Sequence, residues 1–263
     1  MLVKVNRVNS KNEIQQLLSE GVDIIGISIK LSDTNSDSRA LSLSEIKNIQ
    51  SQITIPNLSL NLNLNEYRKE DISRLANLIK PNSLNLFIEA NSLRNPSELN
   101  EEHLSTIQVI NETELDVISF GNGFGYDGPS TIPDSLGVYK NIKYQEVNID
   151  TLGSNSQRRI KNKKEWSKLL NIEILEQSKL GDTILESITE SMENRPYLVD
   201  DRNIDTVKID KLIEIGAKGI TMSLRGLNED ENLNKLPNEN QIASMFELKK
   251  IIESTRRIKK HWL

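Results

Sequence analysis

The chain contains no cysteine, few aromatic residues and no long apolar segment, and each absence excludes a class of protein. Its 263 residues include no Cys and only 4% Phe, Trp and Tyr. Without Cys there is no disulfide, no thiolate metal site and no cysteine nucleophile. No apolar run approaches the roughly 20 residues of a membrane-spanning helix, and Met1 leads into LVKVNRVNS without an apolar signal region. We therefore expect a cytoplasmic protein with no membrane partner.

Positive charge is also in short supply. The chain has 33 Lys and Arg against 38 Asp and Glu, a formal net charge of -5 at pH 7. Nucleic acids and anionic lipids are attracted by clustered positive charge, so we expect no nucleic-acid partner. The partners that remain are a small-molecule ligand and a second copy of the chain, which gives a monomer or a homodimer. The length fits one (β/α) barrel or two ordinary domains.

A repeated unit organises the chain: a short apolar strand, a polar helix start, an amphipathic helix and a Gly or Pro stop. Ser10 to Glu13 and Ser42 to Glu45 both match the capping box, in which the first and fourth residues bond each other's backbone N–H groups. Gly21 ends the first of these helices, since Gly adopts a positive φ without strain. Helices alternating with apolar strands predict parallel pairing and right-handed crossovers.

Eight strands are expected along the chain. They lie near residues 2–6, 24–29, 57–64, 83–89, 105–110 or 115–120, 145–150, 196–199 and 219–223. Eight strands with helices between them predict a single-domain α/β fold, the (β/α)8 or TIM barrel, over residues 1–263. The alternative is a doubly wound open sheet, but that fold predicts a Gly-rich phosphate loop after the first strand, where the sequence has VNRVNS.

Two segments exceed a minimal barrel. Residues 111–140 are rich in Gly and Pro, and residues 171–194 have the pattern of extra helix. We interpret them as insertions after strands five and six, and favour structural padding over a lid or a dimer contact. Asn is abundant, as in LSLNLNLNE. Because Asn suits turns and helix caps, and AT-rich genomes inflate it, we give its number no functional meaning.

Chemistry in such a barrel lies where the strands end, on the C-terminal face. Asp150 follows an apolar strand, where partial desolvation raises the pKa of a carboxyl group, so it is a candidate general acid or base; capping of the next loop is equally expected. Arg39, in the loop after the second strand, is either a clamp for a carboxylate or phosphate or a solvated cation. The remaining residues at strand ends are Asn6, Arg7, Glu89, Asp200, Asp201, Ser223 and Arg225.

Metal sites find little support in the sequence. The two histidines, His103 and His261, are far apart and give no zinc signature. Glu89, Asp150, Asp200 and Asp201 supply hard oxygen atoms, so Mg²⁺ is a candidate ion. Otherwise we expect no cofactor.

The N-terminal region resembles a known family. VKVNRVNSKNEIQQLLSEGVDIIGISI is similar to the start of phosphoribosylanthranilate isomerases, V-K-I-C-G, a helix, then G-A-D-x-I-G-F-x-F. Shorter matches extend to the C-terminus: Ser38 to Ser42 is similar to S-x-R-x-[VI]-S, VNIDT to L-L-D-T, NIDTV to N-P-E-N-V and ITMSLRG to V-D-V-S-S-G. The resemblance implies an isomerase barrel of tryptophan biosynthesis with Asp150 as general acid and Arg39 on the substrate carboxylate. It further implies substrate contacts from Asn203, Ser223, Arg225 and Gly226.

The positions at which the sequence departs from the family pattern bear on its function as much as the matches do. Asn6 occupies the position of the family's basic Cys, and a carboxamide cannot accept a substrate proton at neutral pH. Arg7 replaces the following Gly, Phe87 replaces a His, and Asp200-Asp201 replaces a Gly-Gly pair that holds phosphate. We therefore predict an isomerase or lyase that acts on a small anionic metabolite, a carboxylate or sugar phosphate. The alternative is a pseudoenzyme or protein-binding partner, and unchanged isomerase activity is the least favoured.

Overall fold

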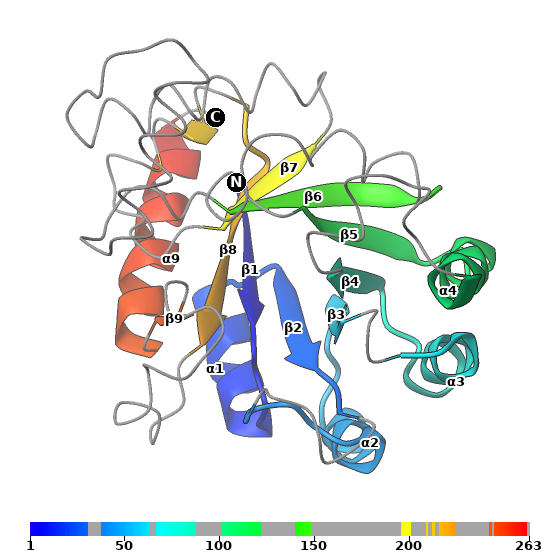
Figure 1. Ribbon diagram of the computed structural model, residues 1–263. Helices are drawn as coiled ribbons and strands as arrows, with labels where there is room; N and C mark the ends of the chain where they lie inside the picture. Colours follow the sequence, from blue (N-terminus) through cyan, green and yellow to red (C-terminus); the bar gives the residue numbers. More distant parts are fainter. Residues whose placement is uncertain are drawn as a thin grey trace, which may run out of the picture.

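The computed structural model describes residues 1–30, 38–63, 67–87, 101–121, 140–148, 196–200, 209, 212–213, 216–224, 242–243 and 245–261. Parallel strands form its centre, and Figure 1 shows them fanning around a common axis with the helices outside. The eight principal strands are β1 (Leu2–Asn6), β2 (Ile24–Ser28), β3 (Leu58–Asn63), β4 (Ser83–Phe87), β5 (Asp116–Gly121), β6 (Ile142–Asn148), β7 (Tyr197–Asp200) and β8 (Gly219–Leu224). A short β9 (Ile242–Ala243) pairs with the end of β8.

Pairing between the first and eighth strands closes the barrel. Each strand pairs in parallel with the next, and Leu2–Asn6 of β1 also pairs in parallel with Gly219–Ser223 of β8. An open sheet leaves both edge strands unpaired on one side, so the doubly wound alternative is wrong. The (β/α)8 prediction is confirmed.

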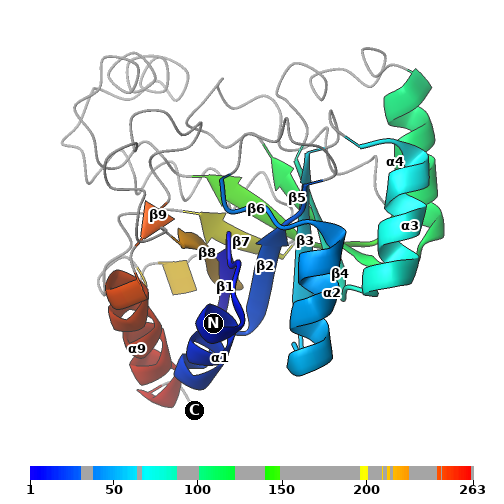
Figure 2. The same ribbon diagram turned by 90° about the horizontal axis from the view of Figure 1, so that it is seen from below.

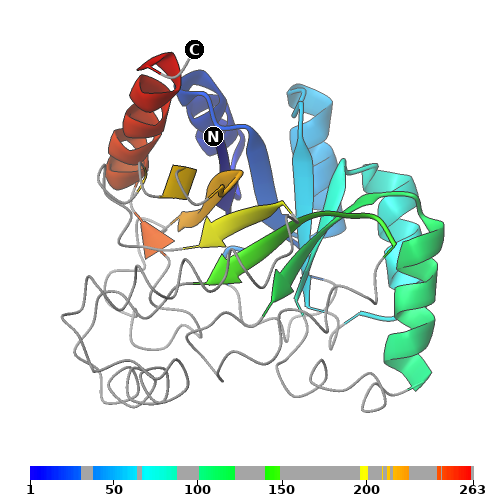
Figure 3. The same cartoon turned by 90° about the horizontal axis from the view of Figure 1, so that it is seen from above.

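The helices cover the outside of the barrel, as Figures 2 and 3 show from opposite sides. They are α1 (Lys11–Glu20), α2 (Leu43–Gln52), α3 (Lys69–Ile79), α4 (Glu101–Glu112) and α9 (Met245–His261). Between helices and strands lies the apolar core, which includes Val3, Val5, Ile14, Leu17, Ile46, Leu60 and Leu75. Burying each such side chain contributes roughly 1.5 to 3 kcal/mol. Among the described residues, no helix is long and apolar enough to cross a membrane.

The capping-box prediction is confirmed at one helix and half right at the other. At α2, the Glu45 N–H donates to Ser42 Oγ at 3.3 Å and the Ser42 N–H donates to Glu45 Oε2 at 2.7 Å. At α1, the Glu13 N–H donates to Ser10 Oγ, but the Glu13 carboxylate accepts the N–H of Asn9 instead of that of Ser10. The second carboxylate oxygen of Glu13 is engaged by Arg39, which belongs to the next loop.

The fifth strand resolves the choice left open by the sequence. Asp116–Gly121 forms β5, and residues 105–110 lie inside α4. The helix end and β5 therefore occupy the start of the segment 111–140 that we interpreted as an insertion. Residues 122–139 and the second expected insertion, 171–194, lie outside the described residues.

Candidate active site at the barrel mouth

A buried ion pair crosses the lumen, the space enclosed by the eight strands. Lys4 Nζ of β1 donates to Glu146 Oε1 of β6 at 2.7 Å, and the two side chains are 0% and 1% exposed. Asn85 of β4 donates from Nδ2 to Glu146 Oε2, and Thr221 of β8 donates from Oγ1 to Oε1, each at 2.7 Å. Since β6 is hydrogen-bonded to neither β1, β4 nor β8, these side chains can meet only inside the barrel.

Further polar residues face the lumen beside this network. Alternate residues of a strand share a face, so Asn6 follows Lys4 into the lumen and Ser223 follows Thr221. Register places Asn61 of β3 beside Asn85, and Ser28 of β2 beside Asn61. Asn residues that we assigned to turns and caps thus line the interior of the barrel.

Asn6 is packed against a glycine. A Cβ built on Gly26 of β2 would lie 2.1 Å from Asn6 Oδ1 and 3.1 Å from the Asn6 Cα. The Asn6 oxygen therefore fills the space that any larger residue at position 26 would need. Register also pairs Asn6 with Ser223, so the expected site residues of β1 and β8 adjoin at the barrel mouth, the end at which the strands' carboxyl termini meet.

Arg7, directly after β1, has a strained backbone. Its φ is 60°, in the left-handed region that costs a non-glycine residue about 1 kcal/mol or more. The Arg7 carbonyl accepts a hydrogen bond from Arg39 Nε at 2.8 Å, and its own guanidinium donates from Nη1 to the Leu224 carbonyl at 3.4 Å. Leu224 ends β8, so the Arg7 side chain reaches across the β1–β8 junction.

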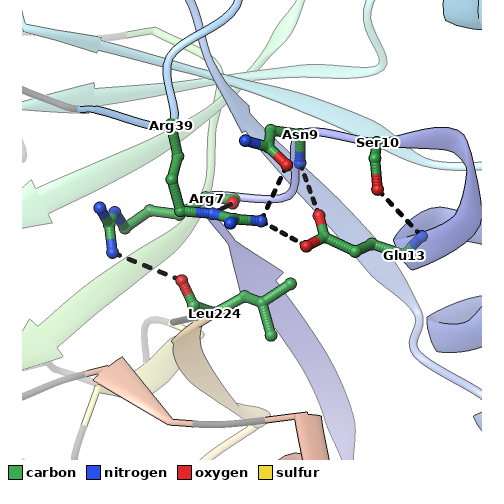
Figure 4. A network of polar contacts seen from close by, with 6 residues as sticks. All are labelled: Arg7, Asn9, Ser10, Glu13, Arg39 and Leu224. Atoms are coloured by element: carbon green, nitrogen blue, oxygen red, sulfur yellow. Dashed lines mark hydrogen bonds and ion pairs between the residues drawn. The ribbon is translucent and has the colours of Figure 1, made fainter. Parts of the chain in front are cut away.

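Arg39 is buried, and Figure 4 shows three groups of the described residues to which it donates. Beyond the Arg7 carbonyl, its Nη2 donates to Asn9 Oδ1 at 2.9 Å and forms an ion pair with Glu13 Oε1 at 2.5 Å. The guanidinium groups of Arg39 and Arg7 point in opposite directions, one toward α1 and the other toward β8. A carboxylate that bound Arg39 would compete with Glu13 for the same charge. Arg39 is thus not a solvated loop cation.

The other predicted site residues are placed only in part. Asp200 ends β7, where its backbone pairs with Thr221 of β8 and Asn148 of β6. Glu89, Asp150, Asp201, Asn203, Arg225 and Gly226 lie outside the described residues. The roles of all these residues, including a Mg²⁺ site, stay predictions. Among the residues described, no group of three or more His, Asp or Glu is placed to hold a metal ion.

Sequence reasoning missed the residues that line the lumen. Lys4, Asn85, Glu146 and Thr221 each lie within a strand, whereas the predicted site residues lie at strand ends. A signal was present, because LSLNLNL alternates Leu with Ser or Asn at the period of a strand. Such alternation indicates one apolar and one polar face, and the helices cover the apolar one.

Comparison with solved structures shows what this architecture is. Phosphoribosylanthranilate isomerase from Thermus thermophilus aligns over 98% of this chain and 100% of its own, with a TM-score of 0.57 and 10% sequence identity. The chain has the fold of these isomerases. The enzyme of the same name from Thermotoga maritima aligns over 98% of this chain and 99% of its own, at a TM-score of 0.57 and 11% identity.

The likeness shows the fold and leaves the chemistry open. Phospho-2-dehydro-3-deoxyheptonate aldolase from Thermotoga maritima also has a TM-score of 0.57, at 12% identity, over 99% of this chain and 69% of its own. One barrel shape therefore serves proteins named as an isomerase and as an aldolase, as expected of a fold that hosts many functions. No family model matches the sequence, and no curated protein matches it.

Proposed function

We propose that the chain is an enzyme, an isomerase or lyase, that binds a small anionic metabolite at the barrel mouth and uses Asp150 as general acid. The metabolite is a carboxylate or a sugar phosphate. The observation that carries the proposal is Arg7, a non-glycine residue kept at φ 60° with its guanidinium at the end of β8.

The position of Arg7 fits recognition of an anion. Strained backbone persists where surrounding contacts enforce it, and it is concentrated at functional sites. Here the contact is the hydrogen bond from Arg39 to the Arg7 carbonyl. Barrels of this class frequently bind phosphate through the loops after strands seven and eight, the side of the mouth that the Arg7 guanidinium reaches. Arg7 would supply the positive charge that offsets Asp200 and Asp201.

The proposed chemistry differs from that of the isomerases that the sequence resembles. Asp150 would donate a proton to the substrate, which a carboxyl group does efficiently when its pKa lies near the working pH. Asn6 cannot remove a proton, because its carboxamide is not basic. The reaction therefore needs either another base or the cleavage of a bond without prior proton removal. In such a cleavage the departing group takes the electron pair of the bond, and Asp150 protonates that group.

Binding and turnover test the proposal separately. Inorganic phosphate and benzoate, as simple anions, should raise the melting temperature of the full-length protein, since a ligand of the native state stabilises it. Arg7→Met should remove the shift, whereas Lys80→Met, at an exposed residue that also has a positive φ, should keep it. Once a substrate is found among sugar phosphates and aromatic carboxylates, Asp150→Asn should abolish turnover; unchanged turnover would disprove the assigned acid.

A second function is favoured by Asn6 itself. A barrel that has an amide at the position of the family's base suits a pseudoenzyme or protein-binding partner. In that case neither phosphate nor benzoate changes the melting temperature. Complementation of a tryptophan auxotroph is the test of the third possibility, unchanged isomerase activity: growth would establish it and absence of growth would exclude it.

A further inference from the structure

The peptide unit that joins Arg7 to Val8 is held from both sides. Its N–H group, on Val8, donates to the Gly26 carbonyl of β2 at 3.1 Å. Its carbonyl, on Arg7, accepts from Arg39 Nε at 2.8 Å. The unit is trans, so its N–H and C=O groups point in opposite directions. Rotation of this peptide plane would therefore break both hydrogen bonds.

The two holds differ in origin. On the side of β2 the barrel itself supplies the hold, because the Val8 side chain is also fully buried in the apolar core. On the other side the hold comes from Arg39, a side chain that lies 32 residues further along the chain, in the loop after β2. Substitution of Arg39 therefore releases one end of the peptide unit and leaves the other in place.

The first turn of α1 fixes the orientation of Arg39. Its Nη2 donates to Asn9 Oδ1 at 2.9 Å and to Glu13 Oε1 at 2.5 Å. The other Glu13 oxygen accepts the Asn9 N–H at 3.0 Å, whereas Glu45 of α2 accepts the N–H of its own N-cap, Ser42. Because the guanidinium is a planar fork, two bonds from Nη2 also set the direction of the Nε–H group. That direction is toward the Arg7 carbonyl.

We infer that Arg39 is a positioning residue, which acts on the substrate only through Arg7. The peptide planes on either side of a Cα set the direction of its side chain, and Arg7, at φ 60°, sends its guanidinium to the Leu224 carbonyl. Arg39 itself is 8% exposed, and Glu13 neutralises its charge. This role differs from the one that the family resemblance implies, in which Arg39 binds the substrate carboxylate.

Three substitutions of Arg39 separate its hydrogen bond from its charge. In Arg39→Gln, the amide nitrogen lies as many bonds from the Cα as Nε does in Arg, so it keeps a donor for the Arg7 carbonyl but carries no charge. Arg39→Lys keeps the charge and has a methylene group at that point. Arg39→Met has neither. A positioning residue requires the donor, whereas a group that binds the substrate anion requires the charge.

The inference rests on the proposed function for the anion that Arg7 binds, and calorimetric titration of the full-length protein with inorganic phosphate is the first measurement. Arg39→Gln should keep the phosphate affinity of the wild type. Arg39→Lys and Arg39→Met should weaken it about fivefold, the factor that corresponds to one hydrogen bond. Gln and Met both remove the ion pair with Glu13, so general stability does not explain a difference between them.

A surface arginine provides the matched control. Arg68→Met makes the same change at a side chain that is 78% exposed, and it should bind phosphate as the wild type does. The reverse order, with affinity kept in Arg39→Lys and lost in Arg39→Gln, would overturn the inference and make Arg39 a group that binds the anion. Equal phosphate affinity in all three Arg39 variants would overturn it as well.

Crystal structures of the variants test the inference even if the wild-type protein binds no phosphate, a result that would count against the proposed function alone. In Arg39→Met, residue 7 should leave the left-handed region and its Nη1 should lose the Leu224 carbonyl. In Arg39→Gln both features should stay. An Arg7 that keeps its φ and its contact with Leu224 in both variants would overturn the inference. Arg39→Lys takes the place of Arg39→Met if the latter does not fold.

Discussion

Lys4 and Glu146, on strands that do not pair with each other, form an ion pair of 2.7 Å across the centre of the barrel. Each belongs to a strand that leads to a candidate site residue: Asn6 lies two residues beyond Lys4, and Asp150 four residues beyond Glu146. Since an interior ion pair fixes the positions of both strands, the pair holds β1 and β6 together across the lumen.

Removing one partner of this pair should be costly. Lys4→Met leaves the Glu146 carboxylate buried without its counter-ion, and the free energy of unfolding should fall by about 3 to 5 kcal/mol. Glu146→Gln should also be costly, because it removes the buried carboxylate to which Lys4 Nζ donates at 2.7 Å. The double variant should lose less than the sum, since no unpaired charge remains. Urea denaturation measures all three; strictly additive losses would show that the pair does not interact.

A surface pair provides the control. Lys143 and Asp116 also form an ion pair, but their side chains are 47% and 40% exposed. Water screens such a pair, so Lys143→Met should change the free energy of unfolding by no more than about 1 kcal/mol. A loss as large as that of Lys4→Met would mean that burial is not the cause of the difference.

Gly26 should tolerate no side chain while Asn6 is present. In Gly26→Ala the new methyl group would overlap Asn6 Oδ1, and overpacking of this kind costs about 1 to 3 kcal/mol. Adding Asn6→Ala removes that oxygen and should restore part of the stability, although the Asn6 Cα remains close. The melting temperatures of Gly26→Ala and of the double variant, compared with that of the wild type, measure both effects. A Gly26→Ala variant as stable as the wild type would contradict the placement of Asn6.

The fold could be predicted from the sequence because each local signal agreed with the barrel. The capping box at Ser42, the stop at Gly21 and the apolar strands after them all depend on contacts within a few residues. The ion pair of Lys4 with Glu146 joins residues 142 positions apart, and nothing local links them. Similarly, the sequence places Arg39 at the mouth, but its partners Asn9 and Glu13 come from the loop before α1 and from the first turn of α1.

Glu45 should make the stability of α2 depend on pH. The hydroxyl and the backbone N–H of Ser42 donate to its carboxylate and hold the pKa of Glu45 below its ordinary value. A lowered pKa stabilises the folded state above the unfolded pKa of about 4.3, and the contribution is lost as the pH falls through the folded pKa. Glu45→Gln should therefore lower the melting temperature slightly at pH 7. Below pH about 4 the difference should shrink, because protonated Glu and Gln are both uncharged.

The strain at Arg7 should be measurable against a matched position. Arg7→Gly relieves the left-handed backbone, which favours the variant by about 1 kcal/mol, but it also removes the hydrogen bond to Leu224. Lys80→Gly relieves the same backbone strain at the end of α3, where the φ of Lys80 is 51°. Lys80→Gly should be at least as stable as the wild type in urea, whereas Arg7→Gly should gain less because it loses the hydrogen bond to Leu224. Only Arg7→Gly should lose the melting shift with phosphate. Equal phosphate shifts in the two variants would remove Arg7 from the binding site.

Substitution of Glu13 can show whether Arg39 binds the substrate (a clamp) or only stabilises the loop after β2 (a brace). The Arg39 guanidinium is neutralised by Glu13 at 2.5 Å, so a substrate carboxylate would have to compete with this partner. If Arg39 binds the substrate, Glu13→Gln frees its charge, and benzoate should bind several-fold more tightly. If Arg39 only braces the loop, Glu13→Gln should lower the free energy of unfolding by about 1 to 3 kcal/mol and leave benzoate binding unchanged. Calorimetric titration of Glu13→Gln and Arg39→Lys distinguishes the two: weaker binding in Arg39→Lys with tighter binding in Glu13→Gln establishes the clamp, because a brace cannot produce opposite signs.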